Sequence, residues 1–439
     1  MIMKKLNTRG FSLVELMVAL AIGLIASLGI VSLFSGTSRT NKVQEGLARL
    51  QENGRYATAR MENDFRMAGA QYCSNSVGNR LPSAPASPMW VDRAPIVFAP
   101  DLALPDSGGM RSVNASGNRS TVPATALYSL SPRYFMQGFT CTTGTSCTPA
   151  LWSTSMFPTA GLAAGRRVPN SDILTIRYLR GTGWPINGQG NCASGGSITL
   201  APQAGDDPIS FVPASSQLAL ITDCQTPSIV PISDVAGNTL TVGLRLPSTA
   251  EPVCGSISDR DVRVFDFSRD MVTVTYYLAF RADDDPTARP NIGAQRLVPT
   301  LIRRENGIEQ ELVRGVDRLD FRYGVRDSTG NYRFLTAAQV DSRLGGTIQC
   351  TEKETGIPPT GVTTPEPGCL WRSVQRIEAH MLVSPGNEVP SLDTIGLSYR
   401  YMDTDYTVTT STTLPSGIRA MSMPRREFVA NSVMRNRTP

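Results

Sequence analysis

The chain has 439 residues, of which 41% are hydrophobic, so it has ample material for a large buried core. Its formal net charge is +5, and Lys4, Lys5 and Arg9 near the start supply three of these positive charges. The remaining arginines are scattered, and the lack of a basic stripe argues against a nucleic-acid-binding protein. With His380 as its single histidine the chain cannot form a His-Glu-x-x-His site, and it has neither a Gly-x-Ser-x-Gly turn nor a Walker A loop.

The first informative segment is a short basic leader that ends at Gly10 and is followed by an apolar run from Phe11 to Phe34. As a helix this run would be about 36 Å long, enough to cross a bilayer. Its only charge is Glu15, and a lone carboxylate in lipid is costly unless a cation neutralises it. Cleavage after Gly10 creates such a cation, which a neighbouring copy in a filament can offer to Glu15. We therefore predict a subunit that is cleaved and then assembled.

Two simpler interpretations of the apolar run are a secretory signal peptide and a plain signal anchor. A signal peptide has an apolar region of only about 7–15 residues and ends at a small-x-small site. A plain anchor leaves Glu15 unexplained, because carboxylates within membrane segments usually have a function. Lys4, Lys5 and Arg9 place the N-terminal side in the cytoplasm, so we expect everything after Phe34 to be exported.

A resemblance to the class III signal of type IV prepilins and type II secretion pseudopilins lies in Gly10-Phe11-Ser12-Leu13-Val14-Glu15-Leu16. The resemblance implies that a membrane prepilin peptidase cleaves after Gly10 and methylates the new N-terminal Phe11. It also implies that Glu15 is the assembly residue. The leader is then residues 1–10, and the transmembrane and assembly helix is residues 11–34.

The helical period continues over residues 35–70, which we expect to form an amphipathic helix. Its apolar face consists of Val43, Leu47, Leu50, Ala57, Met61, Phe65 and Ala68. One helix from Phe11 to Gly69 would be about 88 Å long, with its first half in the membrane and its second half under a globular head. Gly36, Gly46 and Gly54 lower its helix propensity and are points where it can bend.

Residues 51–69 resemble the helix-end segment of PilW-type minor pilins, which carry a Gly-Arg pair and then Asp-x-Arg-Met-Ala-Gly. Weaker patches of the same resemblance follow in order at residues 171–178, 222–224, 311–324 and 434–437. The resemblance implies a minor pilin that joins a tip complex and primes type IV pilus assembly, in the service of twitching motility, adhesion or DNA uptake. It implies a single-pass inner-membrane protein with a periplasmic head before assembly, and a place at the pilus tip or cell surface afterwards.

The partners implied by this resemblance are other minor pilins, a large tip adhesin, the major pilin, the prepilin peptidase and the inner membrane. No cofactor and no small-molecule substrate are expected. The first alternative is a minor pseudopilin of a type II secretion system, although the large tip pseudopilin of such systems typically lacks the glutamate found here as Glu15. An alternative of another class is a periplasmic enzyme that uses the apolar run only as an anchor.

Residues 71–167 form a Pro/Ser/Gly-rich region without a long periodic pattern, which predicts loops with short strands. It is either a displayed binding surface or a tolerated insertion. Eight cysteines without a Cys-x-x-Cys motif fit disulfides formed in an oxidising compartment. The local candidates are Cys141–Cys147 and Cys350–Cys369, and a weaker pairing of Cys192–Cys224 would leave Cys73–Cys254.

From residue 168 to residue 439 the period is two, which predicts an antiparallel β-rich head packed on the exported half of the helix. The clearest strands are centred on Val272–Phe280, Leu319–Val325 and Ile377–Val383. Turns are expected at Asn306-Gly307 and Gly330-Asn331. The predicted fold is therefore α+β and pilin-like, with loop insertions.

Catalytic and metal-binding residues are not expected. His380 lies in a strand-like run and is interpreted as structural or surface-exposed. The acidic groups Asp283-Asp284-Asp285 and Asp259, Asp261, Asp266 contain the oxygen ligands that calcium prefers, but they lack an EF-hand pattern. We interpret them as solvated loop carboxylates.

Overall fold

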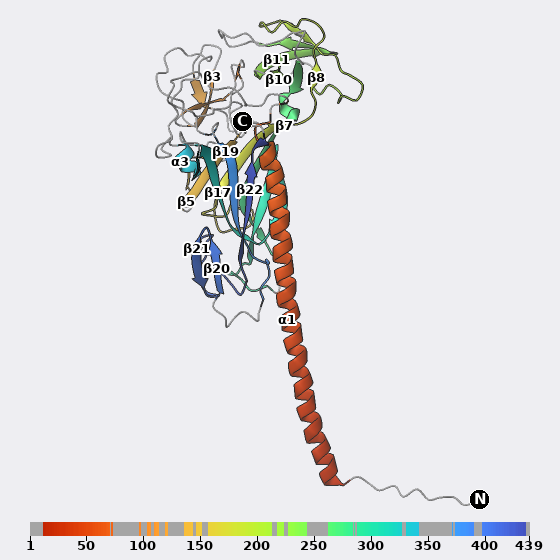
Figure 1. Cartoon of the computed structure of the whole chain (residues 1–439), viewed down its shortest axis with the longest axis vertical. Helices are drawn as coiled ribbons and strands as arrows, with labels where there is room; N and C mark the ends of the chain where they lie inside the picture. The colour runs from red at the N-terminus through yellow and green to blue at the C-terminus, as the bar shows by residue number, and fades with distance from the viewer. Residues whose placement is uncertain are drawn as a thin grey trace, which may run out of the picture.

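The fold is one long helix, α1 (Leu13–Met67), packed along one side of a β-rich head (Figure 1). This confirms the expected α+β, pilin-like architecture. The computed structural model describes residues 12–70, 72, 96–97, 103–106, 109–113, 119–121, 136–143, 146–151, 157–212, 217–223, 227–243, 262–283, 285, 288–326, 331–341, 371, 374–389 and 397–435.

The helix α1 runs through Gly36, Gly46 and Gly54 without a break. Two of these glycines are explained by the head, which approaches the helix closely there. A Cβ built on Gly54 would lie 2.4 Å from the Phe428 ring, and one on Gly46 would lie 3.3 Å from Val389. A Cβ on Gly36 would have no neighbour within 4 Å. Gly46 and Gly54 therefore allow close packing between helix and head.

Two antiparallel sheets form the main body of the head. The first has the order β16 (Ile308–Arg314), β15 (Leu297–Glu305), β14 (Met271–Ala282), β7 (Ile173–Leu179), β5 (Met136–Thr143) and β6 (Ser146–Thr148). The second has the order β18 (Tyr332–Leu335), β17 (Val316–Arg326), β19 (Val374–Val383) and β22 (Arg426–Val433). The edge strands β16 and β22 both contact α1, and apolar residues of the helix and both sheets share one core. The helix therefore completes the core of the head.

The predicted strands are confirmed, with one difference in β14. Val274, Tyr276 and Leu278 face the shared core, as the alternation indicates. Tyr277 and Ala279 on the opposite face are also buried, in a second cluster that contains Phe139, Phe157, Ile173 and Ile302. A central strand covered on both faces loses the polar alternation that an exposed face would show.

The turn expected at Asn306-Gly307 joins β15 to β16. Both residues have positive φ angles, 47° and 90°, which is the backbone that an Asn-Gly hairpin turn requires. The turn expected around Gly330 falls partly outside the described residues.

A small barrel is inserted into the head between β7 and β14. Its strands are β8 (Trp184–Pro185), β9 (Ser197–Thr199), β10 (Gln217–Thr222), β11 (Ser228–Ala236), β12 (Thr239–Val242) and β13 (Arg263–Asp266), and β1 (Ile96–Val97) pairs with β11. The two ends of this sheet meet at a bridge between Ile186 and Leu200, and the interior has its own apolar cluster. Leu179 of β7 and Met271 of β14 remain directly paired, so the insertion leaves the head sheet continuous. The barrel lies at the end of the head farthest from the N-terminal half of α1 (Figure 1).

The remaining elements are short. They are β2 (Ala103–Asp106), β3 (Gly109–Val113) and β4 (Arg119–Thr121) in one meander, the hairpin β20 (Leu397–Tyr401) and β21 (Thr404–Val408), and the helices α2 (Phe267–Asp270) and α3 (Ala337–Asp341).

Cys141 and Cys147 are joined by a disulfide, with their Cα atoms 4.0 Å apart. Cys192 is also disulfide-bonded, and its expected partner Cys224 lies outside the described residues. Cys73, Cys254, Cys350 and Cys369 lie outside them too, so those pairings stay predictions. Within the described part of the chain no cysteine is free.

Asp172 links the two sheets of the head. One carboxylate oxygen accepts the backbone N–H of Cys141 in β5 at 2.9 Å, and the other accepts that of Phe321 in β17 at 3.1 Å. Burial, and then the nearby charge of Asp320, raises the pKa of Asp172 to about 7. The carboxyl group is therefore partly protonated near neutral pH.

The contact at Gly54 yields a stability prediction. We expect Gly54→Ala to lower the free energy of unfolding by about 1–3 kcal/mol, because the added methyl group displaces the Phe428 ring. The matched control is Gly36→Ala, which adds the same group in open space and gains up to about 1 kcal/mol of helix propensity. Denaturant unfolding in detergent measures both variants, and equal stabilities would contradict close packing at Gly54.

Candidate functional site

The first turn of α1 is held by a capping box. Ser12 is the N-cap, and its Oγ accepts the backbone N–H of Val14 at 3.3 Å. In return the Glu15 carboxylate accepts the backbone N–H of Ser12 at 2.9 Å. Glu15 is exposed and lies one turn or less from the start of the helix. The predicted processing residues Gly10 and Phe11 lie outside the described residues.

The stem, residues 12–34, exposes an apolar surface all the way round. Its large apolar side chains are largely accessible, up to 78% for Phe34. Among the described residues, α1 is the only helix long and apolar enough to cross a membrane, with a mean hydropathy of 2.5 in its most apolar window. A surface of this kind needs lipid or other apolar helices to cover it.

The other end of α1 is fixed to the head by a buried ion pair. Asp64 and Arg303 of β15 are only 4% and 2% exposed. The Arg303 Nε donates to Asp64 Oδ2 at 2.7 Å, and Nη2 donates to Oδ1 at 3.3 Å. Tyr178 of β7 donates its hydroxyl to Oδ1 at 3.2 Å, and Tyr276 of β14 donates to Oδ2. Three neighbouring strands of one sheet therefore converge on a single helix carboxylate.

The charges at this junction stabilise each other. Burial lowers the pKa of Arg303, but the hydrogen bonds and charge of Asp64 outweigh it and raise that pKa above its usual value. Burial, and then the charge of Asp64, raises the pKa of Tyr276, so its hydroxyl stays protonated and donates. Arg303 also contacts Glu305 at 2.6 Å, and Glu305 contacts Arg180 at 3.0 Å. The network runs from the buried helix face to the head surface.

Asp64 is the aspartate of the Asp-x-Arg-Met-Ala-Gly stretch, and the sequence assigns it no role, although its position carries a signal. It occupies the apolar face of the amphipathic helix next to Met61 and Phe65, where an unpaired charge would be costly. Arg303 carries a weaker signal, since it continues the core-facing alternation of Leu297 and Leu301 in β15.

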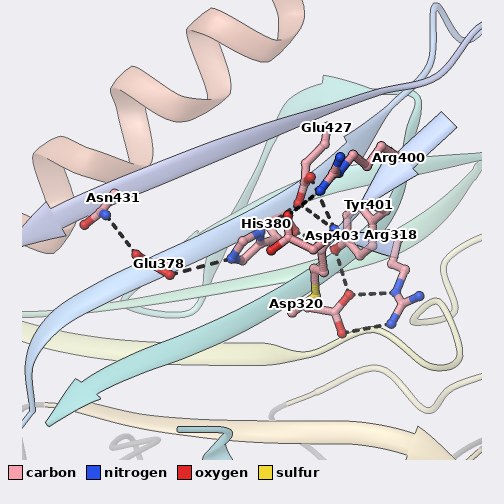
Figure 2. Close-up of polar contacts among 10 residues, drawn as sticks. Arg318, Asp320, Glu378, His380, Arg400, Tyr401, Asp403, Glu427 and Asn431 are labelled. Atoms are coloured by element: carbon pink, nitrogen blue, oxygen red, sulfur yellow. Dashed lines mark hydrogen bonds and ion pairs between the residues drawn. The ribbon is translucent and has the colours of Figure 1, made fainter. Parts of the chain in front are cut away.

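His380 lies in a polar cluster on the face of the second sheet opposite α1 (Figure 2). Its Nδ1 is 2.7 Å from Glu427, and its Nε2 is 3.7 Å from Glu378. Glu427 also accepts the backbone N–H of Met402 at 3.2 Å, and Tyr401 donates its hydroxyl to Asp320 at 2.7 Å. These contacts join the β20–β21 hairpin to the sheet.

The described members of the acidic groups considered for calcium do not form one site. Asp283 pairs with Arg296 at 3.3 Å, and Asp266 accepts a hydrogen bond from Ser210. Asp259, Asp261 and Asp284 lie outside the described residues. Within the described ranges no group of three or more His, Cys, Asp or Glu side chains could hold a metal ion.

The junction yields a second prediction. We expect Asp64→Asn to lower the free energy of unfolding by about 3 kcal/mol, because Arg303 stays buried after losing its main counter-charge. The control is Glu62→Gln on the same helix. It removes the partly exposed ion pair between Glu62 and Arg66 and should lower the free energy of unfolding by at most about 0.5 kcal/mol. Thermal unfolding in detergent compares the two, and similar losses would show that the buried pair does not fix the helix.

A family model of the prokaryotic N-terminal methylation motif matches residues 5–31. The match contains the Gly10–Phe11 junction, Glu15 and most of the stem, and it ends before residues 51–69. No curated protein and no solved structure matches the chain. The matched range covers the segment in which processing and assembly are expected, and it includes the start of an apolar helix that packs on an antiparallel head. Together these findings support a type IV pilin-like or pseudopilin-like protein.

Proposed function

We propose that the chain is a minor pilin that joins a priming complex for type IV pilus assembly and stays at the filament tip. The observation that carries this proposal is Glu15, the one charge in an exposed apolar stem that begins at a methylation motif. In this mechanism the prepilin peptidase cleaves after Gly10 and methylates Phe11. The stem then leaves the inner membrane and enters a bundle of other pilin stems.

The capping box supports a role for Glu15 in contacts between subunits. One carboxylate oxygen accepts the Ser12 N–H, so the side chain is held at the helix start. A carboxylate can accept several hydrogen bonds, so Glu15 retains capacity for the ammonium of a neighbouring chain. Lipid and packed stems both exclude water, and this makes such a pairing much stronger than it would be at a surface.

Placement at the tip is supported by the size of the head. The barrel inserted between β7 and β14 adds a second apolar core to the end of the head away from the stem (Figure 1). A subunit repeated along a shaft must fit between closely spaced neighbours, whereas a subunit at the tip has no neighbour beyond it. The stem also has no proline, unlike many major pilins.

The alternative is a minor pseudopilin of a type II secretion system, because the methylation motif is common to both classes. The two functions predict different losses when the gene is deleted. A minor pilin is needed for surface pili, whereas a minor pseudopilin is needed for the release of secreted proteins. In either case the partners are other pilin-like subunits, and the head is periplasmic before assembly.

The proposal predicts that Glu15→Ala leaves membrane insertion intact but reduces pilus number and co-purification with partner pilins by about tenfold or more. That factor corresponds to the loss of about 1.4 kcal/mol of pairing energy. The control is Glu45→Ala, which removes an exposed acid of the same helix outside the stem. Electron microscopy of pili and affinity purification measure the outcome. Wild-type pili and wild-type partner recovery in Glu15→Ala cells would contradict the assembly role.

A further inference from the structure

Between the stem and the head, α1 has a polar segment, residues 35–45, that we call the collar. It begins after Phe34, the last residue of the apolar run, and ends before Gly46, the first buried residue of the helix. Gly46 packs beside Val389 and Pro385 of the head. The collar is helical, and the hydroxyl groups of Thr37 and Thr40 bond to backbone carbonyls one turn back. Neither the apolar run nor the head accounts for this segment.

The collar carries two cations, Arg39 and Lys42, and both are exposed. The sequence has no acidic residue between Leu16 and Gln44. The next acid, Glu45, pairs with Arg49 at 2.6 Å. Within the described ranges no ion pair reaches either collar cation.

Among the described residues, the head offers these cations no counter-charge where it first meets the helix. The acid next to that contact, Glu388, already accepts two hydrogen bonds from Arg289, at 2.8 and 3.1 Å. Arg39 lies seven residues before Gly46 and therefore on the side of α1 that faces the head. The two exposed cations thus lie on α1 between the end of the stem and the first buried contact with the head, where an external anion can reach them.

The backbone of the collar lies just above a lipid headgroup layer, within reach of its long side chains. Arg39 lies five residues beyond Phe34, about 7.5 Å along the helix axis, and Lys42 lies about 12 Å beyond it. The headgroup layer is about 5–7 Å thick on each side of the hydrocarbon core. Helix side chains tilt towards the N-terminus, so both long side chains lean back towards the bilayer.

We propose that Arg39 and Lys42 bind the phosphate groups of anionic phospholipids in the leaflet below the head. The proposal rests on the proposed function only in requiring that the stem spans the bilayer before assembly. Each cation should favour an anionic over a neutral lipid by about fivefold. Contacts of this strength orient a waiting subunit, and they are weak enough to break when its stem enters a filament.

The test measures lipid preference around the whole chain in phosphatidylcholine vesicles. Electron paramagnetic resonance compares the association of trace spin-labelled phosphatidylglycerol with that of spin-labelled phosphatidylcholine. We expect the double variant Arg39→Gln/Lys42→Gln to lose at least about fivefold of the preference for phosphatidylglycerol. The control Arg55→Gln/Arg60→Gln removes the same charge about 30 Å or more beyond Phe34 and should keep that preference.

Three results would overturn the proposal. An equal loss in both double variants would assign the preference to overall charge. No loss in either would show that the collar cations do not bind anionic lipid. An unchanged lipid preference with lost co-purification of partner pilins would show that a neighbouring subunit occupies the collar. Because lipid preference is measured on isolated subunits, a failure of the pilus assembly proposal would leave this result intact.

Discussion

The rest of the structure depends on the buried ion pair between Asp64 and Arg303. Buried ion pairs are weak evidence for stability, because removing two charges from water costs much of what their attraction returns. Their value here is positional, because a shift of α1 by one turn would leave both charges buried without their partners. Tyr178 and Tyr276 add two donors and complete the coordination of the carboxylate. The head can therefore hold the helix in only one register.

That register extends along the whole helix. α1 is one element of 55 residues, so fixing it at Asp64 also fixes the direction in which the stem leaves the head. The close contacts at Gly46 and Gly54 extend the packing between head and helix towards the stem. None of the described residues of α1 before Gly46 is buried. The same helix thus meets three environments in order, namely the head core, a polar collar and an apolar phase. In the apolar phase the capping box holds Glu15, which is the only charge of the stem.

Local sequence patterns predicted the elements well and their contacts poorly. The apolar run, the amphipathic period and the alternating strands each depend on neighbouring residues, and so does the Asn306-Gly307 turn. Asp64 and Arg303 are 239 residues apart, and no local pattern pairs them. The barrel closes through strands of two and three residues, too short to show a period. Gly54 indicates a bend and a close contact equally well until the position of Phe428 is known.

The central claim is that this chain is processed and assembled as a filament subunit, and the state of its mature N-terminus tests that claim most directly. The decisive measurement is intact-mass and N-terminal peptide mass spectrometry of the protein purified from its native membrane. We predict a chain that begins at Phe11 and carries an N-methyl group. An intact Met1, or a chain that begins after Phe34, would contradict this claim.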